Sequence, residues 1–216
     1  MPDPVKSRRY DSPLRREAAA RTRRAVLDAA HDLFTTRGWH GTAVAEVARR
    51  AGVSLDTVYS SVGRKPALLT AVVDMELAGG PEPLPAEQRD YVRRIRSATG
   101  GRARIEVYAA ALVETMPRVA PLLLALRAAG DDDPECARAA AAVSDRRAAN
   151  MRLFAADLRA TGDLRPDLDD EAVALLVWSM NGPEYWMLLR GRGLAPAACG
   201  RLLVDVWSRA LLVDPG

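Results

Sequence analysis

Residues 42–65 read TAVAEVARRAGVSLDTVYSSVGRK and predict two short helices joined by a tight turn. The first of these helices carries one apolar stripe at helical spacing, formed by Val44, Val47, Ala48 and Ala51. The hydroxyl of Thr42 can cap the start of this helix. Gly52 ends it, because only glycine takes the left-handed conformation of a helix C-terminus without steric cost. The first half of the stretch is therefore a short helix with defined ends.

The second predicted helix extends from Leu55 to Val62 and begins after Ser54, a good N-cap residue. Val58 and Val62 lie one turn apart and face inward. The outward residues are Leu55, Asp56, Thr57, Tyr59 and Ser60. This is the pattern of a helix-turn-helix, whose second helix lies in the major groove of DNA. An ordinary helical hairpin inside a core has the same short turn, so the flanking residues must separate the two interpretations.

The flanks extend the pattern with a preceding helix, a Gly-aromatic-x-Gly-Thr segment and a lysine that opens a further helix. With these features the chain resembles the DNA-binding domain of TetR-type transcriptional regulators. The resemblance is carried by Gly38-Trp39-His40-Gly41-Thr42, Val47-Ala48, Ala51-Gly52-Val53-Ser54, Thr57-Val58-Tyr59 and Lys65 with Leu68-Leu69. The chain departs from the family at Ser61, usually His or Tyr, and at Val62, usually aromatic. These departures imply a different packing beneath the second helix.

The predicted DNA contacts comprise base readers and phosphate contacts. Leu55 can contact a thymine methyl group and Asp56 a cytosine amino group, although Asp56 can equally stabilise the first turn of its helix. Tyr59 can pack its ring on the core and place its hydroxyl on a phosphate. Lys65 lies at a helix start, where backbone N–H groups also favour an anion. The predicted DNA-binding residues are Thr42, Ser54, Leu55, Asp56, Thr57, Tyr59, Ser60 and Lys65.

Composition favours an all-α fold. Of the 216 residues, 49% are hydrophobic and only 5% are aromatic, whereas β-rich folds need more β-branched and aromatic residues. Residues 1–78 carry 13 basic and 9 acidic side chains, and residues 79–216 carry 18 and 19. The positive charge thus lies on the part with the helix-turn-helix pattern, where DNA would bind.

Metal sites, cofactors and membrane segments are not expected. Cys136 and Cys199 form no CxxC pair, and His31 and His40 are the only imidazoles, so the sequence predicts no zinc site or disulfide framework. The run 131–133 of three aspartates lacks the alternating oxygen ligands of a calcium loop and is interpreted as a helix cap. No apolar run matches a membrane span or a signal peptide. We expect a soluble, cytoplasmic protein with reduced thiols.

Glycine and proline divide the chain into segments. Residues 1–12 are interpreted as a basic arm that either follows the DNA minor groove and phosphates or remains a solvated tail. Residues 13–63 form the predicted helix-turn-helix domain, residues 64–78 a connecting helix and residues 79–86 a linker. Residues 87–216 form the predicted ligand-binding and dimerisation domain. Its helices are expected at 87–98, 102–115, 117–129, 134–161, 170–190 and 196–213.

The last two predicted helices each carry a broad apolar face. Such faces either pack against other helices of the same chain or join a second chain. The resemblance implies the second arrangement, because TetR-type regulators dimerise through a four-helix bundle of these helices. The predicted interface residues are Leu176, Val177, Leu203, Val206, Trp207 and Ala210.

A ligand pocket is predicted around Gly182-Pro183, where the proline removes a backbone hydrogen bond and kinks the helix. Aromatic, apolar and a few polar side chains gather near this kink, a mixture typical of small-molecule sites. Aromatic residues at helical spacing also form cores and interfaces, and that alternative stays open. The predicted lining is Tyr108, Met116, Met151, Phe154, Trp178, Asn181 and Tyr185.

The resemblance implies a homodimeric, ligand-responsive transcriptional regulator, with repressors the commoner kind in the family. A small molecule in the helical domain would move the two DNA-reading heads out of register with a near-palindromic operator, with helix 64–78 as the lever. Two other classes stay open: a ligand-independent architectural DNA-binding protein, and an all-α enzyme that uses Glu184 and Tyr185. The sequence contains no glycine-rich phosphate loop and no Ser/His/Asp set, so an enzyme is not the expected class.

Overall fold

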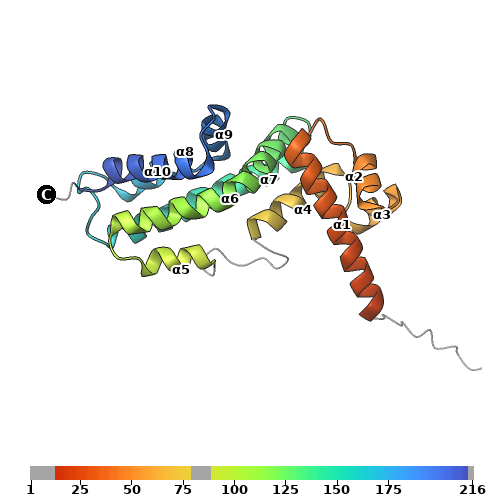
Figure 1. Ribbon diagram of the computed structural model, residues 1–216, viewed down its shortest axis with the longest axis horizontal. Helices are drawn as coiled ribbons and strands as arrows, with labels where there is room; N and C mark the ends of the chain where they lie inside the picture. Colours follow the sequence, from red (N-terminus) through yellow and green to blue (C-terminus); the bar gives the residue numbers. More distant parts are fainter. Residues whose placement is uncertain (1–12, 79–88, 214–216) are drawn as a thin grey trace, which may run out of the picture.

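The computed structural model describes residues 13–78 and 89–213, which form ten α-helices and no strand (Figure 1). The first four helices are α1 (Pro13–Arg37), α2 (Val44–Ala51), α3 (Leu55–Ser61) and α4 (Lys65–Ala78). The other six are α5 (Asp90–Ser97), α6 (Gly101–Gly130), α7 (Pro134–Arg159), α8 (Asp170–Met180), α9 (Pro183–Gly191) and α10 (Pro196–Leu211). The all-α prediction is confirmed for these residues. The predicted arm, 1–12, and linker, 79–86, lie outside the described residues.

The helices α1–α4 form a head at one end of an elongated molecule, and the remaining helices form its body (Figure 1). The long helix α6 runs through the body and reaches α1 and α4, which it contacts directly. In the view of Figure 1, α5 lies below α6, and α8 and α10 lie above it. Because α6 packs against both parts, it connects the head to the body.

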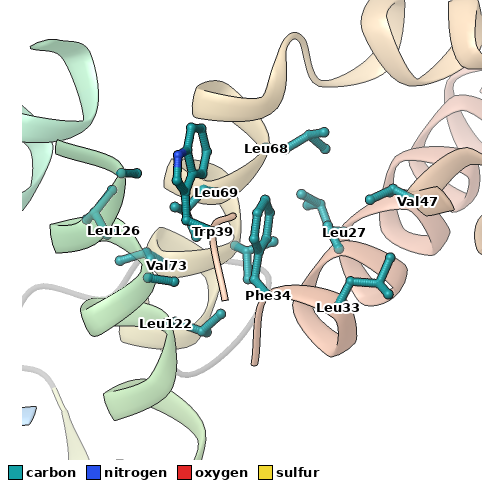
Figure 2. Packing of buried hydrophobic residues seen from close by; sticks show 14 of the residues in the cluster. Leu27, Leu33, Phe34, Trp39, Val47, Leu68, Leu69, Val73, Leu122 and Leu126 are labelled. Carbon is teal, nitrogen blue, oxygen red and sulfur yellow. The ribbon is translucent and has the colours of Figure 1, made fainter. Parts of the chain in front are cut away.

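A cluster of buried side chains from α1–α4, α6 and α7 forms the core of the head (Figure 2). Within it, the rings of Phe34 and Trp39 stack with centroids 6.3 Å apart. We call this cluster the head core; it includes Phe34, Trp39, Val47, Val58, Leu68, Leu69, Val72, Val73, Leu122, Leu123, Leu126 and Val143. The head therefore has no core separate from α6 and α7, and any shift of these helices changes its packing.

The predicted helix-turn-helix is confirmed. Gly52 follows α2 in the left-handed conformation, with φ 68°. The Ser54 hydroxyl accepts the backbone N–H of Thr57 at 3.1 Å and so caps α3. Val58 is fully buried in the head core, which fixes the outward face of α3. The turn residues and the inward valine together set the orientation of the second helix.

The predicted cap at Thr42 is wrong. Ala43 occupies the N-cap position of α2 and makes no side-chain cap hydrogen bond. Thr42 is buried, and its hydroxyl donates to the carbonyl oxygen of Gly38 at 2.8 Å. Gly38 adopts a positive φ of 65° at the end of α1. The Thr42 hydroxyl therefore closes the turn after α1 and is satisfied inside the protein.

Replacing Gly52 with alanine is expected to lower the free energy of unfolding by about 1–2 kcal/mol, the cost of the left-handed conformation for a residue with a Cβ. An added methyl group would meet no atom within 4 Å, so the loss is purely conformational. Replacement with asparagine, which tolerates this conformation, should cost less. Denaturant unfolding monitored by circular dichroism measures both. Equal stability of the alanine variant and the natural chain would contradict the assigned turn.

The predicted helices 102–115 and 117–129 are in fact one helix, α6, and their separation at Pro117 is wrong. Proline within a helix removes one backbone hydrogen bond and costs about 3 kcal/mol. Two prolines, Pro117 and Pro121, lie inside α6, yet buried residues line the helix from Ile105 to Ala129. Pro117 is on the exposed side, where water can hydrogen-bond the freed carbonyl. Burial along the whole helix outweighs the local cost.

α6 is long and apolar enough, by length and composition alone, to cross a membrane, with a mean hydropathy of 1.5 over its best 18-residue window. Dividing it at Pro117 concealed this length in the sequence. In the structure 56% of that window is buried by the protein, and α6 contacts α1, α4, α5, α7, α9 and α10. Its apolar character is accounted for by its place at the centre of the fold.

The predicted helix 170–190 is interrupted more strongly than the expected kink. α8 ends at Met180, and α9 begins at Pro183 with Gly182 as its extended N-cap, at φ −72° and ψ 154°. The proline ring clashes with the preceding residue in the helical conformation, so Gly182 adopts an extended conformation and the helix ends before it. The two segments consequently form separate helices, and α9 turns away from the line of α8 (Figure 1).

Other predicted boundaries are confirmed by their caps. The Asp133 carboxylate accepts the backbone N–H of Cys136 at 3.0 Å and starts α7. The Asp169 carboxylate accepts the N–H of Ala172 at 2.7 Å and starts α8. α5, α7 and α10 occupy the predicted ranges apart from a few residues at their ends. The aspartate run before α7 thus serves as a helix cap.

Half of the predicted dimer interface lies inside the chain's own core. Val177 and Trp207 are 0% exposed and Leu203 is 1% exposed, and all three pack in the cluster that fills the body. Their placement at a dimer interface is wrong. The prediction assigned the whole apolar face of each helix to a second chain, whereas the inner faces of α8 and α10 pack against α7 and α6 of the same chain. The remaining predicted residues, Leu176, Val206 and Ala210, are half-buried and keep part of their surface accessible.

Candidate DNA interface and effector cleft

The outer face of α3 presents four of the predicted DNA-binding residues. Leu55 is 38% exposed and Tyr59 is 45% exposed, and Asp56 and Ser60 are exposed beside them. Thr57 is half-buried, and its hydroxyl lies 2.8 Å from that of the N-cap serine. The cap residue and Thr57 therefore stabilise the start of α3, and the other four side chains form the accessible surface.

Tyr59 and Lys65 line one hollow of about 680 Å³ between α2, the end of α3 and the start of α4. Arg64 lines the same hollow and is exposed. Arg64 is not among the predicted DNA contacts, although its position directly before Lys65 was a usable signal. A phenol, a guanidinium and an ammonium group thus meet at one depression beside α3, and these are groups that bind backbone phosphates.

Lys65 is positioned by an aromatic ring of the head core. Its ammonium nitrogen lies 4.3 Å from the centroid of the Trp39 ring, a cation–π contact. Partial burial lowers the pKa of Lys65, and the nearby Asp132 carboxylate opposes this shift. The Trp39 indole N–H donates to Asp132 at 3.1 Å. Asp132 follows α6, so the connection between α6 and α7 contacts the residues that flank the DNA-binding helices.

α1 holds the end of α3 through one arginine. The Arg23 guanidinium donates to the carbonyl oxygen of Ser61 at 2.6 Å. This carbonyl belongs to the last residue of α3, where helical carbonyls have no partner within the helix. Arg24, next along α1, pairs with Asp28 at 2.9 Å. Arg23 therefore orients α3 relative to α1, a role that its place in a basic run did not reveal.

The predicted pocket residues of the body form a buried polar cluster. The Asn181 side-chain amide donates to the Tyr108 hydroxyl at 2.6 Å and lies 2.9 Å from the Met151 sulfur. Burial raises the pKa of Tyr108, so its hydroxyl stays protonated at neutral pH. The Arg147 guanidinium donates to the Asn181 amide oxygen. These residues satisfy one another across α6, α7 and the end of α8.

The predicted aromatic lining packs with itself. The Tyr108 ring lies 4.9 Å from Phe154 and 5.8 Å from Trp207, measured between centroids. Met116 is buried in the same cluster, and Tyr185 packs against it. The recess that adjoins this cluster beside α5 has a volume of only about 40 Å³. In the described structure these side chains fill the core of the body, and the larger cavity lies elsewhere.

A cleft of about 510 Å³ opens between α6, α7, α8 and the start of α9. Trp178 is the predicted pocket residue that lines it. We call it the α6–α9 cleft; its lining is Leu123, Leu126, Arg127, Ala140, Ala141, Val143, Ser144, Arg147, Trp178, Ser179, Gly182, Pro183 and Glu184. This volume falls in the range of small-molecule sites. The prediction found the Gly182-Pro183 break at its edge but missed the walls on α6 and α7.

Charged groups lie at the α8–α9 end of the cleft. Arg147 is half-buried, donates to the Trp178 carbonyl at 3.0 Å, and lies 5.6 Å from the centre of the Trp178 ring. Burial lowers the pKa of Arg147, and the nearby Glu184 carboxylate opposes this shift. Glu184 pairs with Arg127 from α6 at the surface. The repeated arginines of α7 carried no signal that would distinguish Arg147 from its exposed neighbours.

The cleft and the head share a wall. Leu123, Leu126 and Val143 line the cleft and also belong to the head core. Figure 2 shows Leu126 on α6 facing the same cluster as Trp39 and Val73 of the head. A group that enters the cleft and displaces these side chains must disturb the packing of α1 and α4, because close-packed cores transmit such shifts.

Residues 26–72 match the model of the bacterial regulatory proteins of the tetR family. The HTH-type transcriptional regulator AlkX of Mycobacterium tuberculosis is 39% identical over 56 residues, a match that spans 26% of this chain and 26% of that protein. The chain thus spans about a quarter of the length of this curated relative. Each match has about the length of one DNA-binding domain.

Two solved structures share the fold over nearly the whole chain. A transcriptional regulator from Saccharomonospora viridis, in complex with choline, has a TM-score of 0.70 at 17% identity and covers 90% of this chain and 100% of its own. NalD, the secondary repressor of the MexAB-OprM multidrug efflux pump in Pseudomonas aeruginosa, has a TM-score of 0.66 at 20% identity and covers 92% of this chain and 100% of its own.

The domain match places the helix-turn-helix of residues 26–72 in a known family, and the fold of the remainder agrees with that family's solved structures. The geometry of α2, the Gly52 turn and α3 agrees with both. Residues 26–72 therefore carry the DNA-binding domain of the bacterial regulatory proteins of the tetR family, and the chain as a whole shares the fold of solved regulators of this kind.

Proposed function

We propose that this regulator binds a near-palindromic operator as a homodimer, represses transcription there, and is released when a small molecule occupies the α6–α9 cleft. We place this activity in the cytoplasm, where DNA and free thiols coexist. The observation that carries the proposal is the shared wall: Leu123, Leu126 and Val143 lie both in the cleft and in the head core.

DNA recognition is assigned to the exposed face of α3. Leu55, Asp56 and Ser60 would reach base edges from the major groove, with the leucine suited to a thymine methyl group. Tyr59, Arg64 and Lys65 meet at the hollow beside α3 and would hold the phosphates that flank these bases. Phosphate contacts fix the position of the head, and α3 then reads the sequence.

Dimer formation is assigned to the outer faces of the C-terminal helices. Leu175 on α8 is 60% exposed, and Met187 and Leu188 on α9 are 37% and 64% exposed. Leu176 is half-buried beside the first of them. Exposed apolar groups on adjacent helices are the usual mark of a protein interface. A two-fold dimer through this surface would place two α3 helices on one face of DNA, as a palindromic site requires.

Release is a shift between two head arrangements. The ligand must bind one arrangement more tightly than the other, since equal affinity shifts nothing. The α6 leucines of the shared wall pack on α4. Only a short turn separates the start of α4 from the end of α3. Occupation of the cleft would move α6 against α4 and change the distance between the two heads. A solved structure of this fold that contains choline supports small-molecule binding by such a body.

The two competing classes account for less of the structure. A ligand-independent DNA-binding protein leaves the cleft without a use. An enzyme centred on Glu184 would need a carboxylate free to exchange protons, whereas Glu184 is paired with Arg127 and half-exposed. The relatives found for the chain are regulators.

Selection of bound duplexes from a random DNA pool tests the proposal. We expect one motif with two-fold symmetry, whose half-sites are separated by about one helical turn, 34–36 Å. The logarithm of its affinity should fall by about 0.9 per phosphate contact for each tenfold rise in salt. Enrichment of no motif would overturn the proposed function, and an asymmetric single site would overturn the dimeric operator.

A further inference from the structure

We propose that the ligand of the α6–α9 cleft is an organic anion, with an apolar body and a carboxylate or similar oxyanion that Arg147 binds. This inference rests on the proposed function of the cleft as the effector site. It concerns the chemical class of the ligand, which follows from the groups that line the cleft and from the hydrogen bonds that they leave open.

The Arg147 guanidinium has N–H donors that its hydrogen bonds to the described residues do not use. The hydrogen bonds found for it among the described residues, to the Trp178 carbonyl and the Asn181 amide oxygen, both use Nη2. A guanidinium carries five N–H donors in a planar fork that matches a carboxylate. Arg147 is held in place by these two contacts and by the Trp178 ring at 5.6 Å. It is therefore a preorganised cation in the wall of the cleft.

Ser144 supplies a second donor to the cleft. Its hydroxyl belongs to the same lining as Arg147 and can donate a hydrogen bond to a bound acceptor. A guanidinium carries donors and no acceptor. The hydrogen-bonding capacity that Arg147 and Ser144 offer is thus mainly that of donors, which calls for a ligand rich in acceptors.

The balance of charge also favours an anion. Two arginines, Arg127 and Arg147, and one carboxylate, Glu184, line the cleft. Glu184 already pairs with Arg127 and lies close enough to influence Arg147. It is the only carboxylate of the lining, so a cationic ligand would have to break this pair and approach two guanidinium groups. An anionic ligand takes over the place of Glu184 beside Arg147 instead.

Apart from Ser144 and Ser179, the rest of the lining is apolar and sets the body of the ligand. Leucine, valine and alanine side chains from α6 and α7 contribute most of this apolar surface. The leucines belong to the head core, so the apolar body would press on the wall that the head shares. The anionic group would provide orientation, and the apolar body would provide the displacement that the proposed release requires.

Fluorescence titration with 1-anilinonaphthalene-8-sulfonate, an apolar body with one sulfonate, tests the inference on the full-length protein. Its uncharged relative N-phenyl-1-naphthylamine has nearly the same aromatic body. We expect one sulfonate site per protomer, at least about tenfold tighter than the uncharged site, as one or two charge-assisted hydrogen bonds provide. Equal affinity for the two compounds would overturn the assignment.

Two variants locate the charge effect. Arg147→Met keeps much of the side-chain volume and should weaken sulfonate binding by about tenfold or more while leaving the uncharged compound within about twofold. The matched control is Arg152→Met on the same helix, since Arg152 is exposed and pairs with Glu171 away from the cleft. Equal effects of the two substitutions would overturn the role of Arg147.

Glu184→Gln provides a test of opposite sign that does not depend on the stability of the Arg147 variant. Glu184 is half-exposed, so the substitution should leave the fold intact. Removing the competing carboxylate should tighten sulfonate binding by about threefold to tenfold. Unchanged or weaker binding would overturn the inference. Loss of the charge preference in a protein that still selects its operator rejects only the ligand class, whereas failure to select DNA rejects the proposed function itself.

Discussion

Replacing Trp207 with alanine is expected to lower the free energy of unfolding by about 3–5 kcal/mol, the usual cost of removing a large aromatic side chain from a core. Trp207 is 0% exposed, and its ring stacks on Tyr108 with centroids 5.8 Å apart. The surrounding cluster joins α6, α7, α8 and α10. The cavity would lie at the centre of the body, where neighbouring helices cannot close around it.

The control for this substitution is Val206→Ala on the same helix. Val206 is half-buried, so its loss should cost less than about 1.5 kcal/mol. Denaturant unfolding at one fixed protein concentration measures both variants, because dissociation of a dimer would otherwise shift the apparent stability. If the Trp207 variant instead kept its stability and lost its self-association, Trp207 would be an interface residue and the buried placement would be contradicted.

Replacing Tyr59 with alanine is expected to weaken operator binding by about 100-fold or more. A hydrogen bond to a charged phosphate contributes about 1.5–3 kcal/mol, and a dimer would lose two of them. Tyr59 is 45% exposed and lines the hollow that also contains Lys65, so its hydroxyl can reach a phosphate without disturbing the head core. Fluorescence anisotropy with the selected operator measures the loss.

Two further variants separate the hydroxyl of Tyr59 from its ring. Tyr59→Phe should account for most of the loss if the phosphate contact dominates. Ser61→Ala serves as the control, because the Ser61 hydroxyl donates to a helix carbonyl and is not a predicted contact. We expect its affinity within about twofold of the natural chain. Natural affinity in both Tyr59 variants would remove this residue from the DNA interface.

The parts of the fold that local chemistry determines could be predicted from the sequence. Gly52 and Ser54 define the helix-turn-helix because each acts through its own backbone conformation or a hydrogen bond three residues away. Asp133 and Asp169 mark helix starts for the same reason. Their neighbours along the chain are enough to specify these features, so no knowledge of the tertiary packing was needed.

The parts that depend on packing between distant helices could not be predicted. Pro117 locally indicates a helix end, yet α6 continues past it because its apolar side chains are buried against several other helices. Trp207 lies on an apolar face whose pattern is the same for a core and for an interface. The shared wall of the cleft joins Leu126 and Val143, which contact only after α6 and α7 pair. Periodicity identifies a buried face but does not identify its partner.

The central claim is that occupation of the α6–α9 cleft weakens DNA binding by the head. Ser144→Cys places a thiol in the cleft, and Ala142→Cys places one on the exposed surface of the same helix. The natural Cys136 and Cys199 are buried, and burial raises the pKa of both thiols, to about 11 for Cys136. Since the thiolate is the reactive form, a bimane reagent should modify the introduced thiol selectively.

The most direct measurement is the operator affinity of each variant before and after complete modification, verified by mass spectrometry. We predict that the bimane group in the cleft weakens operator binding by at least about tenfold, within the usual range of coupling between two sites. The same group on the exposed face should leave the affinity within about twofold. Unchanged affinity of the fully modified Ser144→Cys variant would contradict the coupling between the cleft and the head.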